Sequence, residues 1–359
     1  MLSSSVGAGN FSEALRIARK EQEQFARLGM VPEAKHFEQV AKRLEEKLLT
    51  EGFFKILFDD QQQPRAPLLK LFNCMDLTPL GPAQDQLDQI QEWAKKLLRN
   101  HSQCEPWYRG ELWGYRGPKF ENQVQPLVDE LGFLDAVAPS FREYQGVLVM
   151  GASLDVIRNR IHYLVKQWET GVRFSHIYFL SGERDLSPVD HRDIADDFGS
   201  PLKIRKDWIK PTEDKFPKTE KEMIEFVWDQ ADIPQEMRGL LVQFINAPKQ
   251  TQEDKKPQKE LPPPETSDTV ISWRNTEPPA GRYLVISNAP YIIGDDVVVR
   301  RISPKTFTFD TVGEATSKNA RVVACMLDVV VHSALETLFE IKGIHFEKVF
   351  AANRKTVVT

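Results

Sequence analysis

The sequence predicts an α/β protein: a Rossmann-like three-layer core with a mostly parallel sheet, preceded by an α-helical N-terminal region. The first observation is an apolar run, Gly146–Met150, that leads through small residues into a helical pattern of apolar side chains. After the helix-ending Gly171, a second apolar run at 176–180 stops at Ser181-Gly182. Strand, turn, helix and strand make a βαβ unit, whose two strands are expected to be parallel neighbours joined by a right-handed crossover.

The second observation is that strands and helices keep alternating up to residue 341. Thr219 and Glu222 have the spacing of a capping box, so a helix is expected to begin at Thr219. Alternation of this kind is typical of a sheet whose strands are connected by crossover helices. Further strands are expected at 240–245, 282–286 and 306–312, and further helices at 268–274, 290–301 and 319–341.

Residues 1–100 precede this core and are expected to form a helical region. An amphipathic pattern that follows Asn10 stops at Leu28-Gly29 and resumes after Pro32, which indicates an αα-hairpin. Additional helices are expected at 85–98 and 124–134. The expected organisation is a helical region at 1–100, a connecting segment at 101–143, the α/β core at 144–345 and a C-terminal tail at 346–359.

Composition excludes several classes of function. The chain has 359 residues, a net charge of -5 and a pI near 5.9, which argue against a nucleic acid or an anionic membrane as the main partner. Three cysteines without metal-ligand spacing indicate no metal site and fit a reducing compartment. No apolar run is as long as a membrane span, and the N-terminus lacks the regions of a signal peptide, so a cytoplasmic protein is expected.

Small or polar residues stand at the carboxyl ends of the expected strands, where open parallel sheets bind their ligands. The helix that starts at Ser153 would add backbone N–H donors, which favour a phosphate or a carboxylate. No G-x-G-x-x-G or Walker A motif is present, so a dinucleotide or nucleotide-hydrolase site has little support. The residues expected to bind an anionic small molecule are Gly151, Ala152, Ser153, Arg158, Ser181, Gly182, Arg184, Ser287 and Asn288.

Charged residues near these strand ends each have a functional and a structural interpretation. Arg184 follows a strand beside Glu183, and these side chains either serve a ligand or form ion pairs. Arg158 and Arg160 lie two residues apart on a helix and do not share a face. One of them can therefore face the cleft while the other lies at the surface, and a surface position is favoured for either alone. Glu183 and Glu314 are candidates for proton transfer, with a helix cap as the structural alternative. Five aspartates lack the spacing of a calcium loop and are expected in a solvated loop: Asp185, Asp190, Asp193, Asp196 and Asp197.

The order of these elements resembles the bacterial family of unknown function typified by YdcF, SanA and ElyC. The resemblance implies a Rossmann-like core, with Thr269 in the ligand site and Glu220 as a further candidate for proton transfer. It implies no particular cofactor or reaction, although one member of the family binds S-adenosylmethionine. The family's glutamate–asparagine pair after the threonine is replaced here by Ile271-Ser272-Trp273-Arg274. The matching segments, over residues 144–340, are V-L-V-M-G-A-S with Arg158, F-L-S-G-E-R, T-E-K-E-M-I with Glu220, S-D-T-V with Thr269, and L-V-I-S-N-A-P-Y.

Two functions follow as alternatives. The first is a small-molecule-binding α/β protein that holds a phosphorylated or nucleotide-like ligand at the carboxyl ends of the strands, and the sequence leaves open whether it is an enzyme. The second is a non-catalytic protein-interaction module, in which the N-terminal helices contact a protein partner. The missing glutamate–asparagine pair and the charged, proline-rich segment 248–266 favour the second function.

The segment 248–266 generates a testable prediction. It contains five prolines and one large apolar residue, Leu261. Burial of a leucine contributes about 1.5–3 kcal/mol, whereas ordering each residue costs about 1–2 kcal/mol, so a mobile surface loop is expected. Replacing 249–264 by a short glycine–serine bridge should change Tm by only about a degree or two, because loop closure depends weakly on length. A thermal unfolding curve without a cooperative transition would instead identify the segment as a structural element.

Overall fold

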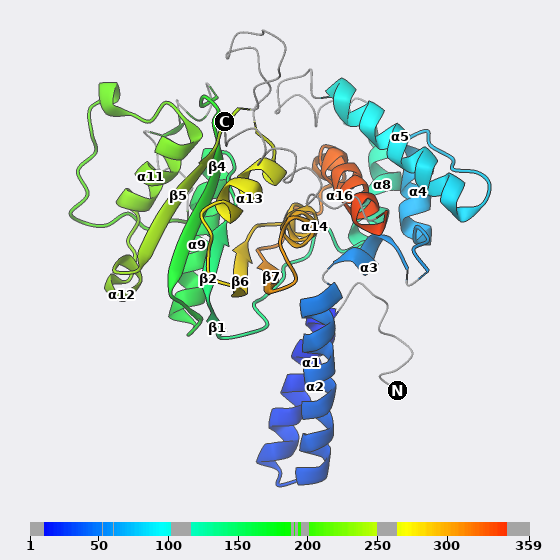
Figure 1. Ribbon diagram of the computed structural model, residues 1–359, viewed down its shortest axis with the longest axis horizontal. Coiled ribbons are helices and arrows are strands. Elements are labelled where there is room, and N and C mark those ends of the chain that lie inside the picture. Colours follow the sequence, from blue (N-terminus) through cyan, green and yellow to red (C-terminus); the bar gives the residue numbers. More distant parts are fainter. Residues whose placement is uncertain are drawn as a thin grey trace, which may run out of the picture. The chain divides into compact units, whose positions relative to one another are not determined.

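The computed structural model describes residues 11–51, 53–59, 61–101, 116–187, 190, 193–194, 201–249 and 264–342 (Figure 1). The chain divides into two compact units. The sheet unit comprises 141–288 and 298–313, and the helical unit comprises 1–140, 289–297 and 314–359. The chain therefore leaves the sheet unit and returns to it once before it ends in the helical unit.

The sheet unit is built on a five-stranded sheet in which each strand pairs with its neighbours in parallel. The strand order is β5-β4-β2-β6-β7, so the sheet grows from β2 through β4 to β5, and then from the other side of β2 through β6 to β7 (Figure 1). This reversal beside the first strand is the order of a Rossmann-like fold. The predicted fold class and the predicted βαβ unit are thus confirmed. The strands are β2 (Gly146–Val149), β4 (His176–Gly182), β5 (Leu241–Ala247), β6 (Gly281–Ile286) and β7 (Phe307–Val312).

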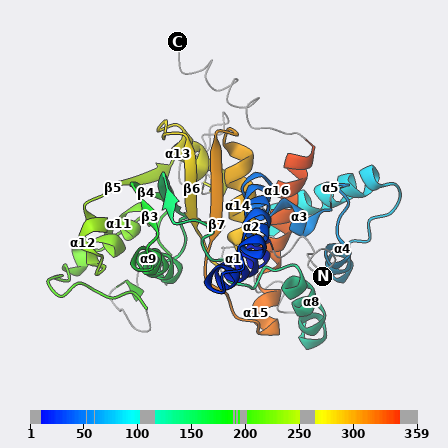
Figure 2. The ribbon, with the colours of Figure 1, turned by 90° about the horizontal axis from the view of Figure 1, so that it is seen from below.

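Helices cover both faces of this sheet, with α9 and α13 on opposite sides (Figure 2). α11 contacts α9, and Trp228 of α11 packs against Phe179 of β4. On the other face, Trp273 of α13 packs against Tyr178 and Tyr283. Burial on both faces explains why the strands have continuous apolar runs. The helices are α9 (Leu154–Glu169), α11 (Glu220–Gln230), α12 (Gln235–Arg238) and α13 (Thr266–Arg274), and α14 (Ile292–Ile302) spans the boundary of the units.

Gly146 makes room for the aromatic side chains on the α13 face. A Cβ at this position would lie 2.8 Å from Cε1 of Tyr283 and 3.3 Å from Cε2 of Tyr178. The hydroxyl of Tyr283 donates a hydrogen bond of 2.7 Å to the carbonyl oxygen of Pro279. Burial raises the pKa of Tyr283, so its phenol stays neutral among the surrounding rings. The absence of a side chain at position 146 therefore lets rings from β4, β6 and α13 meet.

Short and long helices of the helical unit share a large hydrophobic core. α8 contacts α4 and α15, and α16 contacts α5 and α3. Leu57, Phe72, Ile90, Val128 and Leu327 of this core are completely buried. The helices are α3 (Phe54–Leu57), α4 (Ala66–Cys74), α5 (Ala83–His101), α8 (Pro118–Glu130), α15 (Ala320–Ala324) and α16 (Leu327–Ile341).

The predicted αα-hairpin is present as α1 (Phe11–Arg27) and α2 (Val31–Glu51), which pack along one another. Gly29 has a φ of +74°, a left-handed conformation that suits glycine and reverses the chain between the helices. Next to this turn, Phe25 stacks on Phe37 with ring centroids 5.5 Å apart. The left-handed Gly29 and the stacked Phe25–Phe37 pair therefore stabilise the turn end of the hairpin.

The C-terminal helix is the main difference between the predicted and the observed organisation. The sequence predicts one helix at 319–341 within the α/β core, but the structure has two helices, α15 and α16, that pack in the helical unit. Asn319 begins α15, because its side chain accepts hydrogen bonds from the N–H groups of Arg321 and Val322. The apolar pattern indicates a buried helix but does not indicate which core buries it.

Smaller differences concern boundaries. The helix predicted at 124–134 is α8, which begins earlier because Pro118 occupies its first turn. The strand predicted at 240–245 is β5 and extends to Ala247, so Asn246 lies within the strand. None of the helices in the described ranges is long and apolar enough to cross a membrane. The predictions for 250–263, the tail at 346–359, Asp196 and Asp197 concern residues outside the described ranges.

The packing around Gly146 can be tested by substitution. Gly146→Ala is expected to lower the free energy of unfolding by about 1–3 kcal/mol, because the new methyl group would overlap the rings of Tyr283 and Tyr178. Gly239→Ala is the matched control, because a Cβ there would approach its neighbours no closer than 3.6 Å, and it should be neutral or slightly stabilising. Urea unfolding followed by tryptophan fluorescence measures both. Equal stabilities for the two variants would contradict the packing argument.

Candidate site at the carboxyl edge of the sheet

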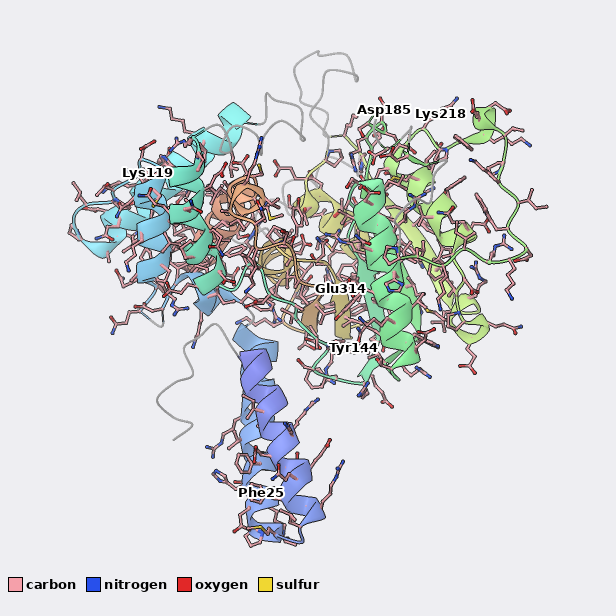
Figure 3. All side chains as sticks on the ribbon, turned by 180° about the vertical axis from the view of Figure 1, so that it is seen from behind. Phe25, Lys119, Tyr144, Asp185, Lys218 and Glu314 are labelled. Atoms are coloured by element: carbon pink, nitrogen blue, oxygen red, sulfur yellow. The ribbon has the colours of Figure 1, made fainter. Side chains whose placement is uncertain are left out.

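The parallel strands of the sheet unit end at one edge, where the sequence predicts a ligand site. Just beyond β4, Asp185 pairs with Thr219 in an isolated bridge, and the N–H of Leu186 donates to the carbonyl oxygen of Lys218 at 2.9 Å. Figure 3 shows Asp185 beside Lys218 at this edge and Tyr144 at the opposite edge of the sheet. These contacts tie the segment after β4 to the start of α11, so side chains from both meet at the edge.

The turn between β2 and α9 approaches β4 so closely that only glycine fits at position 151. A Cβ on Gly151 would lie 2.4 Å from the carbonyl oxygen of Leu180 and 2.7 Å from Oε1 of Glu220. The carboxylate of Glu220, the first residue of α11, therefore lies directly against this turn. The small residue is required by the packing of the protein itself, independently of any ligand.

Glu220 and Arg184 form the central contact of the edge. Glu220 is 5 % exposed, and its Oε2 accepts hydrogen bonds from the N–H of Gly182 at 3.1 Å and from Nε of Arg184 at 2.9 Å. Thr219 caps α11 through reciprocal bonds with Glu222, as predicted, and this places Glu220 in the first turn. Within the described residues, Oε1 of Glu220 and the two terminal nitrogens of Arg184 make no hydrogen bond. The pair therefore retains one carboxylate oxygen and two NH2 groups for other partners.

Asp190 is a second carboxylate at this edge, and its predicted position in a solvated loop is wrong. It is 5 % exposed. Its Oδ1 accepts from the N–H of Leu154 at 2.9 Å, and its Oδ2 accepts from the hydroxyl of Ser187 at 2.7 Å. Burial by itself would lower the pKa of Arg184, but the charges of Glu220 and Asp190 outweigh this and raise the pKa. The first amide of α9, predicted to attract a ligand anion, is thus occupied by a carboxylate of the chain.

Arg158 and Arg160 are both buried, at 3 % exposure each, so the favoured surface positions are wrong for both. Arg160 donates from Nε to Oδ1 of Asn288 at 2.9 Å and from Nη1 to the carbonyl oxygens of Met150 and Gly151 at 2.7 and 3.0 Å. It therefore joins the segment that follows β2 to Asn288, two residues beyond the end of β6, across the reversal of strand order. Arg158 donates from Nη1 to the carbonyl oxygen of Asp193 at 3.4 Å.

The predicted serines at the ends of β4 and β6 are buried within the protein. Ser181 and Ser287 are each 1 % exposed, and the hydroxyl of Ser181 donates to the carbonyl oxygen of Ile245 at 2.7 Å. Ala152 and Ser153 complete the turn before α9, where Ser153 is exposed and its side chain caps no helical amide. Of this group, Ser153 is exposed, Ala152 is partly buried, and Ser181 and Ser287 are buried.

Three further predicted residues form hydrogen bonds with partners other than Glu220 and Arg184. The carboxylate of Glu183 accepts from the N–H of Lys249 at 3.0 Å. The hydroxyl of Thr269 donates to the carbonyl oxygen of Thr266 at 2.9 Å, within α13. Glu314 is assigned to the helical unit, and its carbonyl oxygen accepts from the N–H of Ala289 at 2.9 Å. The structure therefore brings together Gly151, Gly182, Arg184 and Glu220 of the predicted set, and adds Asp190 and Arg160, which sequence reasoning missed.

No sequence signal singles out Asp190 or Arg160, because their partners lie far along the chain or on backbone carbonyls. Asp190 bonds Leu154 across 36 positions, and Arg160 bonds Asn288 across 128 positions. Among the described residues, no group of histidine, cysteine, aspartate or glutamate side chains has a metal-binding arrangement. A hollow of about 450 Å³ beside α11 is lined by none of the predicted residues; its walls are Asp214, Lys215, Phe216, Pro217, Lys218, Glu222, Glu225 and Phe226.

The chain matches no protein-family model, no curated protein and no solved structure. The resemblance to the YdcF-type family stays a prediction from short sequence motifs.

The coupling between Glu220 and Arg184 can be measured by a double-mutant cycle. Replacing either residue leaves a largely buried group without its partner, so Glu220→Gln and Arg184→Met should each destabilise the protein by about 2–3 kcal/mol. The double variant should recover about 1 kcal/mol or more relative to the sum of the single changes. The control pair is Lys221 and Glu225, 3.2 Å apart and about 40 % exposed, for which a coupling of about 0.5 kcal/mol or less is expected. Equal coupling energies for the two pairs, measured by urea unfolding, would contradict the stronger coupling expected for Glu220 and Arg184.

Proposed function

We propose that the sheet unit binds a small phosphorylated or nucleotide-like ligand at the carboxyl edge of its sheet, with an anionic group of the ligand on Arg184. The observation that carries this proposal is the manner in which Arg184 is held. Glu220 engages Nε at 2.9 Å, which orients the guanidinium and leaves its terminal NH2 groups without a hydrogen bond to any described residue. A planar pair of NH2 groups matches the two oxygens of a carboxylate or phosphate.

The packing of the pair supports this role. Arg184 keeps 26 % of its side-chain surface exposed, whereas Glu220 keeps 6 %. A ligand can therefore reach the guanidinium, while the carboxylate beneath it keeps the side chain in one orientation. Such pre-orientation lowers the entropy lost when a ligand binds.

Glu220 is the proposed group for proton transfer. Its Oε2 is held by Gly182 and Arg184, and its Oε1 faces the turn at Gly151. A ligand bound to Arg184 would bring its neighbouring atoms close to Oε1, where a carboxylate can accept a proton from a hydroxyl or an ammonium group. The chemistry that this arrangement supports is acid–base catalysis on a ligand anchored by its anionic group.

One observation favours the second candidate, protein interaction through the N-terminal helices. The turn of the α1–α2 hairpin exposes three apolar residues in close succession, Leu28, Met30 and Val31, at 64, 39 and 57 %. Exposed apolar residues that cluster in this way are typical of contact surfaces. This function gains support if no small molecule binds at Arg184.

The proposal is tested by a thermal-shift screen of nucleotides, sugar phosphates and S-adenosylmethionine. A ligand at about a hundred times its Kd stabilises the folded protein by about 2.7 kcal/mol, which is a shift of several degrees in Tm. Arg184→Gln should abolish the shift. Arg205→Gln is the matched control, because Arg205 is also about 30 % exposed and paired with carboxylates, those of Asp207 and Asp229. A screen without a hit, or a hit that Arg184→Gln leaves unchanged, contradicts the proposal.

A further inference from the structure

The side chains at the same edge indicate which anions can bind there. This inference rests on the proposed function. In Rossmann-like sheets with this strand order, a dinucleotide places its pyrophosphate at the start of the first crossover helix, beside the strand-order reversal. In the sheet unit, that helix is α9 and the reversal lies between β2 and β6. Both places are filled by side chains of the chain itself.

Asp190 fills the first place. Its Oδ1 lies 2.9 Å from the N–H of Leu154, the first amide of α9. Its Oδ2 is fixed by the hydroxyl of Ser187 at 2.7 Å and by the N–H of Ser187 at 3.3 Å, and the hydroxyl in turn accepts from the N–H of Asp190 at 3.1 Å. A phosphate at this amide would have to displace a buried carboxylate and would meet its negative charge.

Arg160 fills the second place. Its guanidinium contacts the carbonyl oxygens of Met150 and Gly151 and the side-chain oxygen of Asn288. These atoms belong to the ends of the two strands that flank the reversal, and the buried guanidinium lies where they meet. At the neighbouring Gly313, a Cβ would lie within 3 Å of the backbone of Ser287 and Asn288, so the chain is closely packed there as well.

We propose that Asp190 is a specificity-determining residue, which acts as a built-in anion at the start of α9. It excludes pyrophosphate-bearing ligands such as dinucleotides, and it restricts the edge to ligands with a single phosphate or carboxylate, held by Arg184. The negative charge of Asp190 also favours ligands with a single anionic group. Arg184 would attract the first anionic group of a ligand, whereas Asp190 would repel a second one.

The test uses inorganic pyrophosphate as the probe and three forms of the full chain. Millimolar pyrophosphate should leave the Tm of the wild-type protein unchanged at matched ionic strength. Asp190→Ala removes the carboxylate and leaves the N–H of Leu154 and the hydroxyl of Ser187 as donors, so pyrophosphate should raise its Tm by about 3 °C. Asp190→Asn is the matched control: it keeps an oxygen opposite Leu154 and should gain no response. NMR of leucine-labelled protein should show the Leu154 amide shifting with pyrophosphate only in Asp190→Ala.

A folded Asp190→Ala variant without a pyrophosphate response, or a wild-type Leu154 amide that shifts with pyrophosphate, overturns the assignment. The wild-type measurement can overturn the assignment even where Asp190→Ala does not fold. Failure of the proposed function looks different, because it is read from monophosphate and carboxylate ligands on wild-type protein and Arg184→Gln. If those ligands do not bind while Asp190→Ala gains the pyrophosphate response, the ligand site at Arg184 is wrong and the exclusion by Asp190 stands alone.

Discussion

The carboxylate of Glu220 has to be compensated where it lies, since a charged group at 5 % exposure without partners would cost several kcal/mol. The N–H of Gly182 and Nε of Arg184 supply that compensation, and each comes from the segment at the end of β4. Glycine is needed at position 151, because a Cβ there would overlap both the carbonyl oxygen of Leu180 and Oε1 of Glu220. One buried carboxylate thereby lies against the turn after β2, binds the segment after β4 and orients the arginine of the proposed site.

Most of the charged side chains described at the sheet edge form hydrogen bonds with other groups of the protein. Asp190 completes the start of α9, and Arg160 joins the ends of neighbouring strands. These contacts replace the open amides and small residues with which Rossmann-like folds usually hold a pyrophosphate. The side chains of Arg184 and Glu220 differ from those of Asp190 and Arg160. Nε of Arg184 is bonded to Oε2 of Glu220, whereas the terminal NH2 groups of Arg184 and Oε1 of Glu220 form no hydrogen bond with the described residues. The proposed ligand site at this edge is therefore more restricted than the fold alone would allow.

The helical unit follows a different constraint, the need to bury long apolar helices. α16 is apolar over most of its length, and it contacts α5 and α3, which contribute to the same core. Segments from both ends of the chain thus build one core, although the sheet unit lies between them in sequence. Composition and periodicity predict each helix but carry no information on this pairing, because an apolar stripe packs equally well on any apolar surface.

The sequence by itself determined the elements whose signals are local. The βαβ unit, the capping box at Thr219 and the αα-hairpin follow from periodicity, small residues and caps, which act over a few positions. Glycine at position 151 and the candidate residues Arg184 and Glu220 could also be selected from strand ends and short motifs. Only the tertiary structure decided that Arg184 is held by Glu220, that Asp190 occupies the start of α9 and that Arg160 is buried between two strand ends. Each of these contacts joins residues from separate elements, and burial is what makes them strong, so no local pattern in the chain can reveal them.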